Sequence, residues 1–173
     1  TETTGLDVRS ARIIEIGLHG RHVALDWSSL VHPGGPIPER SSAIHGIDDA
    51  AVADAPPFAT VWPEAEALIG ARLVLGHSLG FDMAILRREC TAAGLPWREP
   101  VWLDTRLLAL LVEARLPDFS LSALGHWLGL PPHGAHRALA DARMTAAIFE
   151  ALIPRLRERG VHTVGEALAA CRR

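Results

Sequence analysis

The stretch that decides the fold runs from Arg12 to Leu18 and reads Arg-Ile-Ile-Glu-Ile-Gly-Leu. It is apolar, rich in β-branched residues and of strand length. Gly20 and Arg21 then predict a turn, and residues 22–27 predict a second strand. The sequence therefore predicts a β-hairpin near the start of the chain.

Downstream of the hairpin, helical and strand patterns alternate. A short helix is expected to begin near Asp48 or Asp49, and residues 163–166 (Thr-Val-Gly-Glu) form a capping-box pattern that predicts a final helix. Helical periodicity covers residues 58–69, 81–93, 105–114, 120–128 and 137–159, and short apolar runs that predict strands cover 72–76 and 101–103. This order predicts an α/β layer architecture with a mixed sheet.

Length and charge narrow the class of protein. The 173 residues are the size of about one domain. The 17 basic and 20 acidic residues give a net charge of −3, which argues against a protein that holds duplex nucleic acid by non-specific attraction alone. No apolar run is long enough to span a membrane, and Cys90 and Cys171 fit no metal or disulfide pattern. These features predict a cytoplasmic protein with no membrane partner.

The residue types that the chain lacks exclude several kinds of catalytic group. The chain contains no Lys, Asn, Gln or Tyr. A lysine nucleophile, a Schiff base and a tyrosine acid or base are therefore excluded. Neither cysteine has a nearby histidine and no Gly-x-Ser-x-Gly occurs, so nucleophilic catalysis has little support.

Three segments, residues 1–6, 76–82 and 136–142, combine acidic or imidazole groups with glycine or apolar residues. Each one alone has an ordinary structural explanation. Asp82 and Asp141 stand where helices begin, and acids there interact favourably with the helix dipole. Glu2 alone would be a solvated acid, and His77, just after a strand, would be a hydrogen-bonded structural histidine.

Together these segments resemble one family. Thr1-Glu2-Thr3-Thr4-Gly5-Leu6 is similar to a first exonuclease motif, His77-x-x-x-Phe81-Asp82 to a second, and His136-x-Ala138-x-x-Asp141-Ala142 to a third. Residues 42–47 (Ser-Ala-Ile-His-Gly-Ile) and 103–105 (Leu-Asp-Thr) match the intervening landmarks in order and spacing. Over residues 1 to about 154 the chain thus resembles the DEDDh 3′–5′ exonucleases, which include the ε proofreading subunit of bacterial DNA polymerase III and ribonuclease T.

The resemblance implies a ribonuclease-H-like mixed β-sheet flanked by helices, its first central strand truncated here. It implies one exonuclease domain over residues 1–173, with a motif-bearing core at 1–154 and a C-terminal helical extension at 155–173. The expected substrate is the 3′ end of a nucleic acid, single-stranded DNA being favoured and RNA possible. A DNA polymerase is a candidate partner.

The resemblance also implies two Mg²⁺ or Mn²⁺ ions, which neutralise charge on the attacking and leaving oxygens of a phosphodiester and prefer carboxylate ligands. The expected metal ligands are Glu2, Asp82 and Asp141. His136 is the expected general base, because imidazole titrates near physiological pH. The residues expected to contact substrate are Thr3, Thr4, His45, His77 and Phe81, the last as an apolar face for a terminal base.

Two positions depart from the family pattern. The first motif of the family is Asp-x-Glu, and this chain begins at the x, so the metal-bridging aspartate would stand one position before Thr1. We interpret the sequence as trimmed at that point, and we expect the chain as written to bind metals poorly. Ser78 stands where relatives often carry Asn.

Three alternatives stay open at this stage. One is an RNA-trimming enzyme of the same family. Another is a non-catalytic domain that binds nucleic acid or a partner, favoured by the missing aspartate and the slightly acidic balance. The third is a zinc hydrolase that uses His133 and His136, although no further ligand stands at a recognisable spacing.

Overall fold

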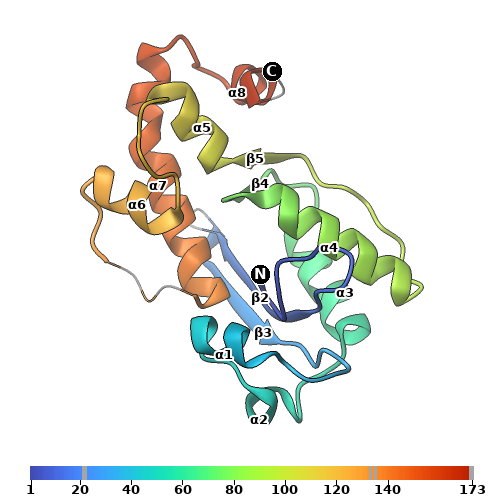
Figure 1. Ribbon diagram of the computed structural model, residues 1–173. Helices are drawn as coiled ribbons and strands as arrows, with labels where there is room; N and C mark the ends of the chain where they lie inside the picture. The colour runs from blue at the N-terminus through green and yellow to red at the C-terminus, as the bar shows by residue number, and fades with distance from the viewer. Residues whose placement is uncertain (21–22, 133, 135, 172–173) are drawn as a thin grey trace.

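A computed structural model describes residues 1–20, 23–132, 134 and 136–171. Its elements, in chain order, are β1 (Glu2–Thr3), β2 (Ile13–Gly20), β3 (Leu25–Leu30), α1 (Glu39–His45), α2 (Asp49–Val52), α3 (Phe58–Ile69), β4 (Val74–Gly76), α4 (Leu79–Ala92), β5 (Trp102–Asp104), α5 (Thr105–Val112), α6 (Leu121–Trp127), α7 (Ala138–Glu158) and α8 (Val164–Cys171). Figure 1 shows how they are arranged. The α/β class predicted from the sequence is confirmed.

The predicted hairpin is formed by β2 and β3, which pair antiparallel from Glu15 opposite Leu30 to Gly20 opposite Leu25. Its second strand was predicted three residues too early. Ala24 adopts a left-handed φ of 49°, which belongs to a turn rather than a strand, so β3 begins only at Leu25. The predicted turn residue Arg21 and the first residue of the predicted strand, His22, lie outside the described residues.

The sheet is divided into two parts. β1, two residues long, pairs antiparallel with β2 to complete a three-stranded part, while β4 and β5 form a parallel pair. Between β2 and β4 lies a cavity of about 360 Å³, lined largely by apolar side chains such as Leu18, Leu75 and Phe149.

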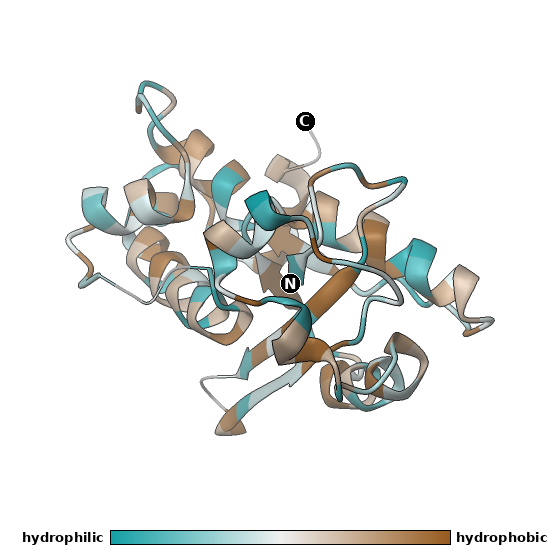
Figure 2. Cartoon of the chain, turned by 60° about the horizontal axis from the view of Figure 1, so that its bottom comes forward, coloured by the Kyte–Doolittle hydropathy of each residue, from teal (hydrophilic) through white to brown (hydrophobic). Residues whose placement is uncertain are grey.

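Helices cover these strands through two main hydrophobic clusters. The first packs α3 and α4 against β2, around Trp62, Ile85 and Ile16. The second packs α5, α6, α7 and α8 around Leu108 and Ile148. Figure 2 shows hydrophilic and hydrophobic residues alternating along these helices, as expected for helices that bury one face. No helix within the described residues is long and apolar enough to cross a membrane.

One helix was not predicted. α1 is only seven residues long and carries no apolar stripe at helical spacing, so its periodicity gave no signal. Its boundaries were nonetheless readable, because Pro38 precedes it and Gly46 ends it with a left-handed φ of 70°. The predicted capping box of α8 is present: Glu166 accepts the amides of His162 and Thr163, and the Thr163 hydroxyl accepts the Glu166 amide.

Candidate active site

Three acidic side chains from distant parts of the sequence come together beside Thr1. Glu2 lies in β1, Asp82 in the first turn of α4, and Asp141 in the first turn of α7. The α-ammonium group of Thr1 donates a hydrogen bond to Asp82 Oδ1 at 2.9 Å, and the Thr1 hydroxyl donates to the same oxygen at 2.6 Å. The charges of Glu2 and Asp141 also act on this ammonium. The three carboxylates therefore lie close to the Thr1 backbone nitrogen.

The pKa values in this cluster reflect its geometry. Burial raises the pKa of the Glu2 carboxyl from its ordinary 4.5 to about 7. The charges of Asp82 and Asp141 raise it as well, while the Thr1 ammonium lowers it. Burial disfavours the charged form of that ammonium, but the neighbouring carboxylates outweigh burial and raise its pKa above 8.0. Because such effects need short separations, the three carboxylates share one electrostatic environment.

The ligand chemistry of this cluster suits a hard divalent cation. Its three side chains are carboxylates, the donors that Mg²⁺ and Mn²⁺ prefer. The residues present therefore fit metal ions in charge and ligand type. Their placement does not yet form a site, because no group of three or more His, Cys, Asp or Glu side chains in the described part of the chain is arranged so that it could hold a metal ion.

The helix that carries Asp82 is anchored from another element. Asp104 ends β5, is buried, and accepts hydrogen bonds from the amides of Ser78 at 3.0 Å and Leu79 at 2.9 Å, where α4 begins. It also accepts the Arg106 amide at 2.9 Å, where α5 begins. One carboxylate therefore satisfies the first amides of two helices. The sequence singled out Asp104 as a landmark but did not predict this double cap.

His136 lies two residues before α7, with a left-handed φ of 63°. Its charge acts on His45, so the two imidazoles lie near one another. His45 is buried at the end of α1, and burial lowers its pKa. Its Nδ1 accepts the Ile47 amide at 3.1 Å, which leaves the proton of the neutral ring on Nε2. The ring also interacts with the Thr3 backbone, although within the described structure the buried Nε2 makes no hydrogen bond of ordinary geometry.

Thr3 and Thr4 follow Glu2, but their hydroxyls are already engaged in the loop that leaves β1. The Thr3 hydroxyl donates to the Gly5 carbonyl at 2.7 Å, and the Thr4 hydroxyl accepts the Arg12 amide at 2.8 Å. The Thr4 carbonyl accepts the Ser41 hydroxyl at 2.9 Å. These bonds fix the path of the loop beside the carboxylates. Contact of Thr3 and Thr4 with a terminal nucleotide stays a prediction.

His77 and Phe81 flank the start of α4. The Thr105 hydroxyl donates to the Gly76 carbonyl at 3.1 Å and makes a hydrogen bond of 3.0 Å with His77 Nδ1. Burial lowers the pKa of His77. The hydrogen bond to Thr105 supports the explanation that His77 is a hydrogen-bonded structural histidine. Phe81 is half-buried next to Asp82 and packs against the first hydrophobic cluster.

Sequence reasoning missed Glu15 and Arg137. Glu15 is buried on β2, and the Arg137 guanidinium lies 2.8 Å from its carboxylate. The signal was Glu15 itself, the single charged residue within the apolar residues 13–18, where a buried glutamate needs a partner. The zinc alternative stays a hypothesis, because one of its two histidines, His133, lies outside the described residues.

A family model described as exonuclease, of the ribonuclease T type, matches residues 1–149. The chain belongs to the exonuclease family. The resemblance based on the five landmarks is thus confirmed.

Named relatives and solved structures agree with this exonuclease assignment. A DNA polymerase III subunit epsilon-like protein of Rhodobacter capsulatus is 39% identical over all of this chain and 26% of its own length. The DNA polymerase III subunit epsilon of Aquifex aeolicus is 33% identical over 90% of the chain and 78% of its own length. Exonuclease X, solved in complex with 5′ overhanging duplex DNA, superposes with a TM-score of 0.74 at 30% identity, over 99% of this chain and 96% of that one.

The exonuclease domain spans only part of several relatives. It covers 26% of the Rhodobacter protein and of a putative bifunctional exonuclease/endonuclease protein of Mycobacterium tuberculosis, and 12% of the PolC-type DNA polymerase III of Thermotoga maritima.

Proposed function

We propose that this exonuclease domain hydrolyses phosphodiester bonds from the 3′ end of single-stranded or mispaired DNA and releases nucleoside 5′-monophosphates. The observation that carries the proposal is the cluster of Glu2, Asp82 and Asp141, in which the charges of Asp141 and Asp82 act on the Glu2 carboxyl. The match to the exonuclease family over residues 1–149 supports the same reaction class.

In the proposed mechanism Glu2, Asp82 and Asp141 hold two Mg²⁺ or Mn²⁺ ions, which would neutralise charge on the attacking and leaving oxygens. His136 accepts the proton of the attacking water, because an imidazole takes up a proton near neutral pH. Phe81 offers its half-exposed ring to the terminal base, a contact that tolerates any sequence.

We further propose DNA as the substrate and a DNA polymerase as a partner, working in the cytoplasm. The similarity to DNA polymerase III epsilon proteins supports the polymerase as a partner, and the DNA in the Exonuclease X complex supports DNA as the substrate. We keep residues 1–173 as one exonuclease domain, with the motif-bearing core at 1–154. Helix α7 runs across the boundary with the proposed extension at 155–173.

The test is degradation of a 3′-labelled and a 5′-labelled single strand with Mg²⁺ or Mn²⁺. It uses the full-length polypeptide, including whatever residues precede Thr1. We expect stepwise loss from the 3′ end and release of 5′-monophosphates. His136→Ala should lower kcat about 10²-fold or more, the range of a lost general base. Asp82→Asn should lower kcat at least as much, because it removes one of the proposed metal ligands.

Asp54→Asn is the matched control, because Asp54 is an exposed carboxylate away from the cluster. Wild-type rates from Asp82→Asn and His136→Ala would contradict the assigned roles.

Faster loss of short RNA than of DNA would favour the RNA-trimming alternative. Activity restored to metal-free protein by Zn²⁺ alone would favour the zinc alternative. Binding of DNA without cleavage would favour the non-catalytic one.

A further inference from the structure

Glu15 makes an unusually complete set of contacts for a buried carboxylate. It is 2% exposed and lies in β2. Arg137 donates to it from Nη2 at 2.8 Å and from Nε at 3.2 and 3.3 Å, and the Ala138 amide donates to Oε2 at 2.8 Å. Every one of these partners belongs to the start of α7.

The Glu15 carboxylate caps the N-terminus of α7. Arg137 is the N-cap residue of this 21-residue helix and makes no side-chain cap hydrogen bond of its own. Glu15 accepts the first helical amide from across the structure, and its negative charge lies at the positive end of the helix dipole. The hydrogen bond and the charge of Glu15 raise the pKa of the Arg137 guanidinium.

We call the contacts of Glu15 with Arg137 and Ala138 the clamp. They lie next to two predicted active-site residues, His136 and Asp141. Arg137 directly follows His136, whose backbone is in the left-handed region. The Arg137 carbonyl accepts the Asp141 amide at 3.0 Å. Glu15 is also the register partner of Glu2 across β1 and β2. A shift of Arg137 would therefore move His136 and Asp141 relative to Glu2.

We propose that Glu15 is a positioning residue for the exonuclease reaction: it clamps the start of α7 so that His136 and Asp141 face Glu2 and Asp82. This inference rests on the proposed function. Geometry of this kind matters because displacement of a catalytic group by about 1 Å can lower a rate about 10²-fold. The clamp acts on the reaction step rather than on substrate contact.

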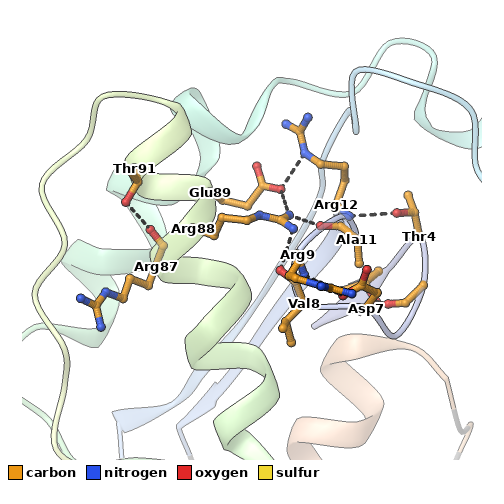
Figure 3. Close-up of polar contacts among 12 residues, drawn as sticks. Thr4, Asp7, Val8, Arg9, Ala11, Arg12, Arg87, Arg88, Glu89 and Thr91 are labelled. Atoms are coloured by element: carbon orange, nitrogen blue, oxygen red, sulfur yellow. Dashed lines mark hydrogen bonds and ion pairs between the residues drawn. The ribbon is translucent and has the colours of Figure 1, made fainter.

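The test compares Glu15→Gln with Glu89→Gln in the full-length protein. Glu89 is also 2% exposed and is held by two arginines, Arg12 at 2.6 Å and Arg88 at 3.0 Å (Figure 3). It lies seven residues beyond Asp82 along α4. Both variants remove one buried, arginine-paired charge and should lower the unfolding midpoint similarly. Only Glu15 touches α7.

We expect Glu15→Gln to lower kcat about 10- to 100-fold at 20 °C, where both variants are folded, with KM changed less than 3-fold. Glu89→Gln should keep kcat within 2-fold of wild type. Amide hydrogen exchange at Ala138 and Asp141 should rise at least 10-fold in Glu15→Gln and stay unchanged in Glu89→Gln. Glu15→Asp, which keeps the charge on a shorter side chain, should recover part of the loss.

Equal kcat for Glu15→Gln and wild type would overturn the positioning role, and so would an equal loss in Glu89→Gln. A wild-type protein that cuts no nucleic acid would instead refute the proposed function. In that case amide hydrogen exchange still tests the clamp without an activity assay. Unchanged exchange at Ala138 and Asp141 in Glu15→Gln would refute it.

Discussion

At the scale of single residues, Gly17 on β2 shows how closely the strand and α7 approach. A Cβ atom added to Gly17 would lie 2.3 Å from the Leu139 amide nitrogen, a backbone atom that cannot move aside cheaply. Gly17 is two residues from Glu15, and Leu139 follows Ala138, which Glu15 holds. The glycine thus allows the close contact in which the clamp forms.

Gly17→Ala should destabilise the protein by about 1–3 kcal/mol, the usual cost of overpacking. Gly80→Ala is the control, since a Cβ there meets nothing within 4 Å and Gly80 lies in helix α4. Ala is preferred in helices by about 1 kcal/mol, so this variant should match or exceed wild type. Urea unfolding of both variants measures the difference. A Gly17→Ala protein as stable as wild type would contradict the close approach.

At the scale of elements, Asp104 sets the beginnings of both α4 and α5 from the end of β5. Single caps stabilise by about 1 kcal/mol each, so we expect Asp104→Ala to lower the free energy of unfolding by about 2 kcal/mol. Asp48→Ala is the matched variant, because Asp48 caps only α2, through the Ala51 amide at 2.8 Å. It should lower stability by about 1 kcal/mol. Equal losses in the two variants, measured by thermal unfolding, would argue against a double cap.

The sequence predicted best the helices that show apolar residues at helical spacing. Helices α3, α4, α5, α6 and α7 were each placed within two residues at both ends. The start of β3 was misplaced because its boundary depends on the left-handed turn at Ala24, which no local pattern announced. Helix α1 has the same length as α6 and was missed because its residues carry no apolar stripe at helical spacing.

At the scale of the whole molecule, the candidate site is a product of the fold. Glu2, Asp82 and Asp141 are separated by dozens of residues, and each looks alone like a surface or helix-end acid. Their family order made the cluster predictable. The contact of Glu15 with α7 was not predictable, because it depends on which strand faces the start of the helix, and local sequence does not encode that choice.

The central claim is that these three carboxylates together hold divalent cations. The most direct measurement is anomalous scattering from crystals of the full-length polypeptide soaked in Mn²⁺. The account predicts two peaks about 3.5–4 Å apart, coordinated by Glu2, Asp82 and Asp141. Peaks confined to other parts of the molecule, or no peak within ligand distance of these carboxylates, would contradict it.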